Sequence, residues 1–172
     1  MLKKTLLAFI LVCSFFPKSF GQVESSITEA IQGYFYAQLN QDYELLLDYI
    51  YPGLIENAGG REAMKNTLMT IHQNQLKKGI KVREFKLREP IQHTKVGVEI
   101  HALVPVTSIS KVPGGQLTTE NNLIAVSEEG MVHWYFIETT SLDERNIQKV
   151  LENWNGSLML PFKKAPIFKE DK

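Results

Sequence analysis

The spacing of apolar residues divides the chain into a helical first half and a strand-rich second half. From Ile27 to Leu39 they recur at three- and four-residue steps, which is the pattern of one helical face. Ser26 followed by Glu29 fits a capping box, so we expect this helix to begin at Ser26. Gly33 inside it weakens the helix by about 1 kcal/mol relative to alanine, and we interpret it as a point where another group packs closely.

Two further helices follow. Asp42 is a good N-cap for a short helix over residues 43–49, and Pro52 disfavours helical backbone at the residue before it. The third helix is expected over residues 61–78, with an apolar stripe that we interpret as facing the core. Gly79 is a natural residue to end it.

From residue 80 the apolar period changes to two, which predicts strands. We expect strands over residues 80–91, 94–107, 116–127 and 131–139, joined by short turns as an antiparallel meander. The strand over 94–107 has one clearly apolar face, made of Val96, Val98, Ile100, Ala102, Val104 and Val106. This alternation predicts a sheet covered on one side only, with Glu99 and His101 facing solvent or a second copy.

The end of the chain is expected to return to helix. Ser141 with Glu144 fits a second capping box, and an apolar stripe follows over residues 142–154. Beyond it, residues 158–168 are apolar enough to dock on the domain, either as a strand or as an extended arm.

The first 21 residues have the pattern of a secretory signal peptide. Lys3 and Lys4 precede an apolar run over residues 6–16, and Ser19-Phe20-Gly21 supplies small residues before a cleavage site. The run is too short for a membrane-spanning anchor, which needs about 20 apolar residues. We therefore expect a cleaved protein, exported to a periplasm or outside the cell, without a membrane span after cleavage.

Cleavage after Gly21 would change the composition. It removes Cys13, the only cysteine, and with it any disulfide, thiolate nucleophile or cysteine-ligated metal. It also removes three of 19 basic residues, leaving 16 against 19 acidic ones. No basic patch with interleaved aromatic residues is present, so we do not expect nucleic-acid binding.

The order of elements predicts one α+β domain over residues 22–172. Three N-terminal helices pack on a curved antiparallel sheet, and a C-terminal helix and tail extend the domain from about residue 141. The segments Tyr34-Phe35-Tyr36-Ala37 and Gln41-Asp42-Tyr43-Glu44-Leu45-Leu46 resemble the first-helix pattern of the NTF2-like superfamily, the cone-shaped cystatin-like α+β fold. Gly59-Gly60-Arg61-Glu62-Ala63-Met64 resembles its third-helix start, and Gly130 with Trp134-Tyr135-Phe136-Ile137 resembles a late strand.

The resemblance covers roughly residues 26–140 and implies a conical domain that encloses a pocket. In that superfamily the pocket holds an enzyme site, binds a small ligand or serves only as core, and dimers through the outer face of the sheet are common. Fold alone does not choose among these. The implied partners are a small apolar or amphipathic ligand and a second copy of the chain.

Strand parity and the resemblance together suggest a set of pocket residues. Glu120 shares parity with Asn122, and Glu138 with Trp134; Tyr34 and Tyr51 are candidate hydrogen-bond donors from the helices. In an isomerase-like site such a carboxylate would act as acid or base beside tyrosine donors. The alternative is that these are strand-end carboxylates and ordinary core aromatics.

Local metal and nucleophile motifs are absent from the sequence. The four histidines have no i,i+2 strand or i,i+4 helix pairing: His72, His93, His101 and His133. We expect neither a metal nor a cofactor. The leading hypothesis is a non-catalytic domain that binds a small ligand or a protein partner. The alternatives are a cofactor-free isomerase or dehydratase of the ketosteroid-isomerase or SnoaL kind, and an assembly role of the sheet face and tail.

Overall fold

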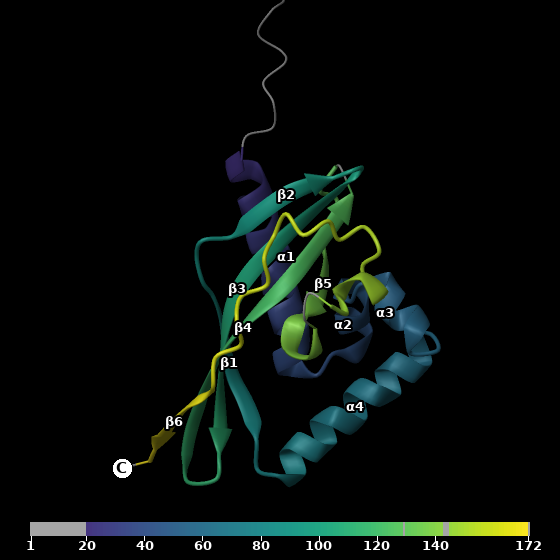
Figure 1. Ribbon diagram of the computed structural model, residues 1–172. Helices are drawn as coiled ribbons and strands as arrows, with labels where there is room; N and C mark the ends of the chain where they lie inside the picture. Colours follow the sequence, from purple (N-terminus) through teal and green to yellow (C-terminus); the bar gives the residue numbers. More distant parts are fainter. Residues whose placement is uncertain (1–19, 129, 143–144, 172) are drawn as a thin grey trace, which may run out of the picture.

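The computed structural model of the chain describes residues 20–128, 130–142 and 145–171, and it shows an α+β domain (Figure 1). The predicted signal peptide lies almost wholly outside these ranges. Within them, no helix is both long enough and apolar enough to cross a membrane.

In the described part of the chain, four α-helices precede the sheet. They are α1 (Phe20–Asn40), α2 (Tyr43–Tyr49), α3 (Pro52–Asn57) and α4 (Arg61–Lys77). The sequence did not predict α3, although Pro52 favours it: proline at the first position of a helix lacks only an N–H that would have no partner there. The N-cap of α2 is confirmed, since the carboxylate of Asp42 accepts a hydrogen bond from the backbone N–H of Leu45.

The prediction that α1 begins at a Ser26 capping box is wrong. The helix begins six residues earlier, so Ser26 lies in its interior. There its hydroxyl donates to the carbonyl of Val23 at 2.9 Å and accepts from the indole N–H of Trp134 at 3.1 Å. Ser26 therefore does not cap a helix. Its side chain joins α1 to Trp134, just before the strand over Tyr135–Glu138.

Six antiparallel strands form one curved, open sheet (Figure 1). They are β1 (Lys81–Leu87), β2 (Gln92–Val96), β3 (Glu99–Val112), β4 (Gly115–Glu128), β5 (Tyr135–Glu138) and β6 (Ile167–Glu170). The main path is β1-β3-β4-β5; β2 also pairs with β3, and β6 also pairs with β4.

The expected strands over 80–91 and 94–107 have the wrong boundaries. The first ends at Leu87, before Pro90, and the second is divided by a tight turn at Gly97-Val98 into β2 and β3. Gly97 has a positive φ of 61°, which favours glycine. Val98 lies at this turn and is 71% exposed, so it is not part of the apolar face.

The sheet carries an apolar cluster on each face. On the helical side, α1 and α2 pack on Ala102, Val104, Leu123 and Ala125. On the opposite side, the chain after β5 packs on Leu103, Ile124, Val126 and Ile137. The prediction of a sheet covered on one side only is therefore wrong.

His101 shows this correction most clearly. We expected it to face solvent or a second copy, but it is fully buried. Its ring stacks on Trp154 at 6.0 Å between centroids, and its Nε2 hydrogen-bonds Glu99. The C-terminal extension supplies this cover.

The predicted helix over residues 142–154 is wrong in its described part, which holds only the 3₁₀ turn Ile147–Lys149. Glu144, the second half of the predicted capping box, lies outside the described residues. The apolar stripe nevertheless identified buried residues. Ile147, Leu151 and Trp154 all pack in the cluster on the sheet face opposite α1 and α2, here called the outer cluster. Further on, the tail ends as a strand: β6 pairs with Gly115–Thr118 of β4.

Candidate functional site

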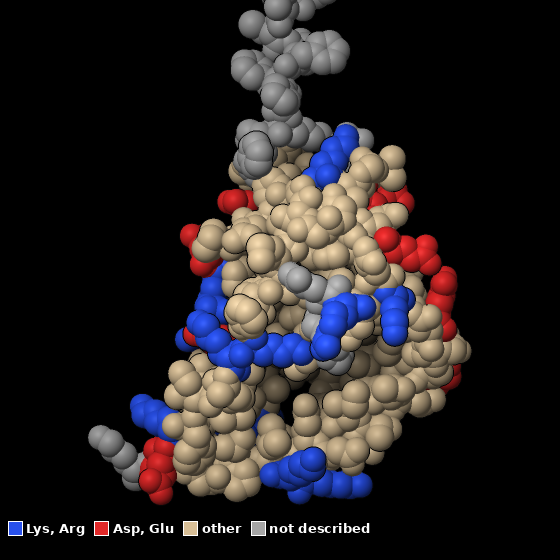
Figure 2. Space-filling model, viewed as in Figure 1, with Lys and Arg blue, Asp and Glu red and all other residues tan. Residues whose placement is uncertain are grey.

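A cleft of about 420 Å³ lies between α4 and the helical side of the sheet. Figure 2 shows the molecule hollowed between the lower part of the sheet and α4. The apolar wall includes Leu46, Ile50, Met64, Leu68, Phe85 and Phe136. The polar groups include Tyr34, Gln38, Tyr43, His72, Gln75 and Glu138.

Helix α4 forms one wall of the cleft without filling it. None of its residues is buried, although it carries the apolar stripe of a core helix. Leu68 is half-buried against the core cluster, whereas Ile71 is 51% exposed and lines the cleft. An apolar helical stripe normally packs against a core, so here the stripe faces a space large enough for a small molecule.

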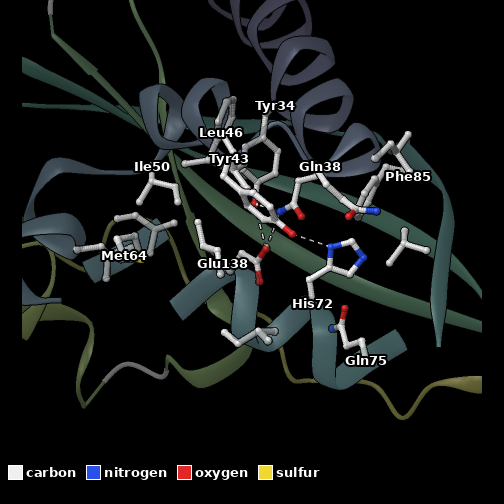
Figure 3. A pocket seen from close by; sticks show the side chains of 18 of the residues that line it. Tyr34, Gln38, Tyr43, Leu46, Ile50, Met64, His72, Gln75, Phe85 and Glu138 are labelled. Carbon is white, nitrogen blue, oxygen red and sulfur yellow. Dashed lines mark hydrogen bonds between the residues drawn. The ribbon is translucent and has the colours of Figure 1, made fainter. Parts of the chain in front are cut away.

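Three polar side chains meet at the centre of the cleft (Figure 3). The hydroxyl of Tyr34 donates to Oε1 of Glu138 at 2.9 Å. The amide of Gln38, one helical turn along α1, donates to the Tyr34 hydroxyl at 2.8 Å and to Oε1 of Glu138 at 3.1 Å. The helix places Tyr34 and Gln38 on one face because residues four apart are neighbours on its surface.

The Tyr34 hydroxyl is held in its neutral form. Burial raises the pKa of Tyr34 well above its ordinary value, and the nearby Glu138 carboxylate raises it further, although the hydrogen bond from Gln38 acts the other way. The side chain is only 4% exposed. Tyr34 therefore acts as a hydrogen-bond donor to Glu138 at neutral pH and not as a phenolate.

A separate pair of polar side chains joins α2 to α4 (Figure 3). The hydroxyl of Tyr43 lies 2.9 Å from Nδ1 of His72. Desolvation raises the pKa of Tyr43, so its hydroxyl stays neutral and can form this hydrogen bond with His72. The cleft thus holds a group of three hydrogen-bonded side chains and a hydrogen-bonded pair between apolar walls, a composition typical of small-molecule sites.

The structure brings together two of the six residues that the sequence suggested. Tyr34 and Glu138 meet in the cleft. Tyr51 instead packs against the outer cluster, and burial raises its pKa, with Glu99 adding to the effect. Trp134 is buried in the core of the helical side, with its indole N–H bonded to Ser26.

Glu120 and Asn122 do not line the cleft. Glu138 pairs with Leu123 across β4 and β5, and paired residues share a face. Asn122 and Glu120 lie at alternate positions with Ile124, on the face that the C-terminal extension covers. There Glu120 forms ion pairs with Arg88 and Lys164, which together hold the pKa of its carboxyl below the usual value.

Gln38, Tyr43 and His72 are cleft residues that the sequence reasoning did not select. Gln38 had a usable signal, since it stands four residues after Tyr34 on the same helix. His72 and Tyr43 come from different helices, so no local spacing connects them. In the described part of the chain, no group of three or more His, Cys, Asp or Glu residues is arranged to hold a metal ion.

Comparisons of the chain with protein-family models, with curated proteins and with solved structures find no match. Function is therefore inferred from the cleft.

Proposed function

We propose that the protein binds a small amphipathic ligand in the cleft between α4 and the sheet. The ligand's apolar body lies against Leu68, Ile71 and Phe85, and its polar end reaches Glu138. The observation that carries this proposal is the apolar stripe of α4, which faces a cleft of about 420 Å³ and has no buried residue. Burying that stripe against a ligand would gain about 25 cal/mol for each Å² removed from water.

The proposal includes a fold family and a compartment. We place the chain among NTF2-like proteins. The order of its elements supports this, as do the helices that pack on one face of a curved antiparallel sheet. We also propose export with cleavage after Gly21, supported by the basic and apolar pattern of the first 21 residues. Dimer formation through the outer sheet face would have to involve the C-terminal extension, since that segment covers Leu103 and Ile124.

A matched pair of substitutions on α4 tests ligand binding. Ile71 and Leu76 are comparably exposed, at 51% and 46%, but only Ile71 lines the cleft. Ile71→Trp should fill the cleft and weaken binding of decanol by about tenfold or more, since the lost contact area is that of an alkyl segment. Leu76→Trp should leave the affinity unchanged. Calorimetric titration measures both, and equal affinities in the two variants would contradict the proposal.

Catalysis is a second candidate, favoured by the Tyr34–Glu138 hydrogen bond inside the cleft. A carboxylate beside a neutral tyrosine donor can move a proton while the tyrosine stabilises the negative charge that develops on the substrate. This is the cofactor-free isomerase or dehydratase alternative. Under it, Glu138→Gln should lower turnover of any substrate by about 10²-fold or more, whereas a binding protein shows no turnover to lose.

A further inference from the structure

We propose that the polar end of the ligand is a protonated primary amine, received by the Glu138 carboxylate. This inference rests on the proposed function, and it assigns the chemical class of the ligand. Three observations support it: Glu138 accepts hydrogen bonds from neutral side chains, it has no basic partner among the described residues, and its Oε2 has no close donor among them.

Glu138 has neutral partners only. Tyr34 and Gln38 donate to it, and no ion pair joins it to a basic side chain in the described part of the chain. Some other carboxylates of the described residues are paired with cations: Glu44 with Arg61 and Lys65, Glu84 with Lys86, and Glu120 with Arg88 and Lys164. Glu138 is thus a solvent-exposed carboxylate that lines the cleft beside apolar walls and has no basic partner among the described residues, so a ligand cation could pair with it.

The two oxygens of Glu138 are unequally occupied. Oε1 accepts from both Tyr34 and Gln38, at 2.9 and 3.1 Å. Among the described residues, Oε2 has only the Thr140 hydroxyl as a partner, at 3.5 Å, which is longer than an ordinary hydrogen bond between oxygens. The two donors fix the carboxylate in place and leave Oε2 free to accept from a ligand. Such preorganisation favours binding because little side-chain order is lost.

A primary ammonium fits this acceptor better than the other simple polar groups. A hydroxyl could also donate to Oε2, but an ammonium adds the attraction between two opposite charges to its hydrogen bond. A ligand carboxylate would be repelled by Glu138. Lys81 also lines the cleft and could attract a carboxylate. Among the described residues no hydrogen bond holds its ammonium as Tyr34 and Gln38 hold Glu138, so it would lose more rotamer freedom on binding.

The aromatic residues near the carboxylate bear on the body of the ligand. The rings of Tyr34 and Phe136 lie 5.1 Å apart, and both residues line the cleft beside Glu138. Both are almost fully buried, so they contribute to the apolar wall against which that body packs. The expected ligand therefore has an alkyl or ring body of small-molecule size and one ammonium group.

Calorimetric titration of the full chain with decylamine, decanol and decanoate at neutral pH tests this inference. The three probes share an alkyl body and differ in the polar end. Decylamine should bind about tenfold or more tightly than decanol, and decanoate should bind most weakly. Glu138→Gln should remove the preference for the amine while decanol binding persists. Glu120→Gln, on the other face of the sheet, should keep the preference.

A second measurement does not depend on the folding of a variant. In the wild-type protein, added salt should weaken binding of decylamine relative to decanol, because salt screens an ion pair at an exposed carboxylate. If decanol binds with an affinity equal to or higher than that of decylamine, the amine assignment is overturned and the proposed ligand binding stands. A preference for decanoate, or an amine preference that survives Glu138→Gln, has the same consequence. Absence of binding by all three probes overturns the proposed function as well.

Discussion

The hydroxyl of Tyr34 and the carboxylate of Glu138, 104 residues apart in the chain, form a 2.9 Å hydrogen bond across the cleft. It joins the first helix to the end of β5 and fixes the one cleft carboxylate that has no basic partner among the described residues. The same bond matters for stability and for the proposed binding, so the two roles must be separated by experiment.

Replacing Tyr34 by phenylalanine should destabilise the protein by about 1–2 kcal/mol, because the hydroxyl's hydrogen bonds with Glu138 and Gln38 are lost while the ring remains. Urea unfolding measures the change. Tyr36→Phe is the matched control, since Tyr36 lies on the same helix and is 60% exposed. A loss in the control equal to that in Tyr34→Phe would show that the Glu138 contact contributes nothing.

The Tyr34 hydroxyl should also make stability depend on alkaline pH. Burial and then Glu138 raise its pKa well above the ordinary value of 10.0. As the pH rises through about 10, the unfolded chain releases this proton while the folded chain keeps it, so the free energy of unfolding falls. Unfolding titrations between about pH 8 and about pH 11 should show a shallower fall in Tyr34→Phe. An unchanged slope in that variant would contradict the stated cause.

Gly33→Ala should destabilise the protein, although alanine is the better helix former by about 1 kcal/mol. An added Cβ would lie 2.0 Å from the hydroxyl oxygen of Tyr49 and 2.7 Å from the adjoining ring carbon. In a Tyr49→Ala background the same change should become stabilising, since the clash is gone. Thermal unfolding of the four proteins in this cycle measures the coupling, and additive effects would rule out the close contact.

The C-terminal extension should contribute to global stability through Trp154. This side chain is 6% exposed and stacks on His101. Trp154→Ala should destabilise the protein by about 3–5 kcal/mol, as expected for a large buried aromatic residue. Phe162→Ala, which alters a side chain that is 99% exposed, should change stability by less than about 0.5 kcal/mol. Equal effects in denaturant unfolding would mean that the extension does not cover the sheet.

Gly115→Ala should release β6 from β4. A Cβ at Gly115 would lie 2.2 Å from the backbone oxygen of Lys169 and 2.8 Å from the ring of Phe168. Limited proteolysis should then remove the tail sooner, while the core persists. Gly130→Ala is the control, since its nearest neighbour would be a Val132 methyl group at an ordinary 3.5 Å. Equal cleavage of both variants would contradict the pairing.

Local signals predicted α2 and α4 well. They missed α3, placed the start of α1 six residues late and predicted a helix over residues 142–154 that the described part of that segment does not form. Asp42 caps the start of α2, and Gly79, with a positive φ, follows the end of α4. Both effects depend on neighbouring residues only, so the sequence predicts them. The division of the second expected strand at Gly97 was missed because apolar alternation continues through the turn. The apolar residues Ile147, Leu151 and Trp154 are buried as predicted, but they do not lie on an α-helix. Residues can be buried against a sheet without helical backbone.

The candidate site was predictable only in part, for a physical reason. Strand parity placed Glu138 with Phe136, and both face the helices. The same parity argument could not show that Glu120 lies on the other face, because one sequence does not reveal which side of a sheet is concave. Likewise, the apolar stripe of α4 looks the same whether the helix packs on a core or stands away from it.

The most direct test of the ligand-binding account is a crystal structure of the protein purified from its own source. The account predicts density for a small elongated molecule along α4, between Ile71 and Phe85, with its polar end within hydrogen-bond distance of Glu138. A structure in which α4 lies against the sheet, with Leu68 and Ile71 buried and the cleft closed, would contradict it.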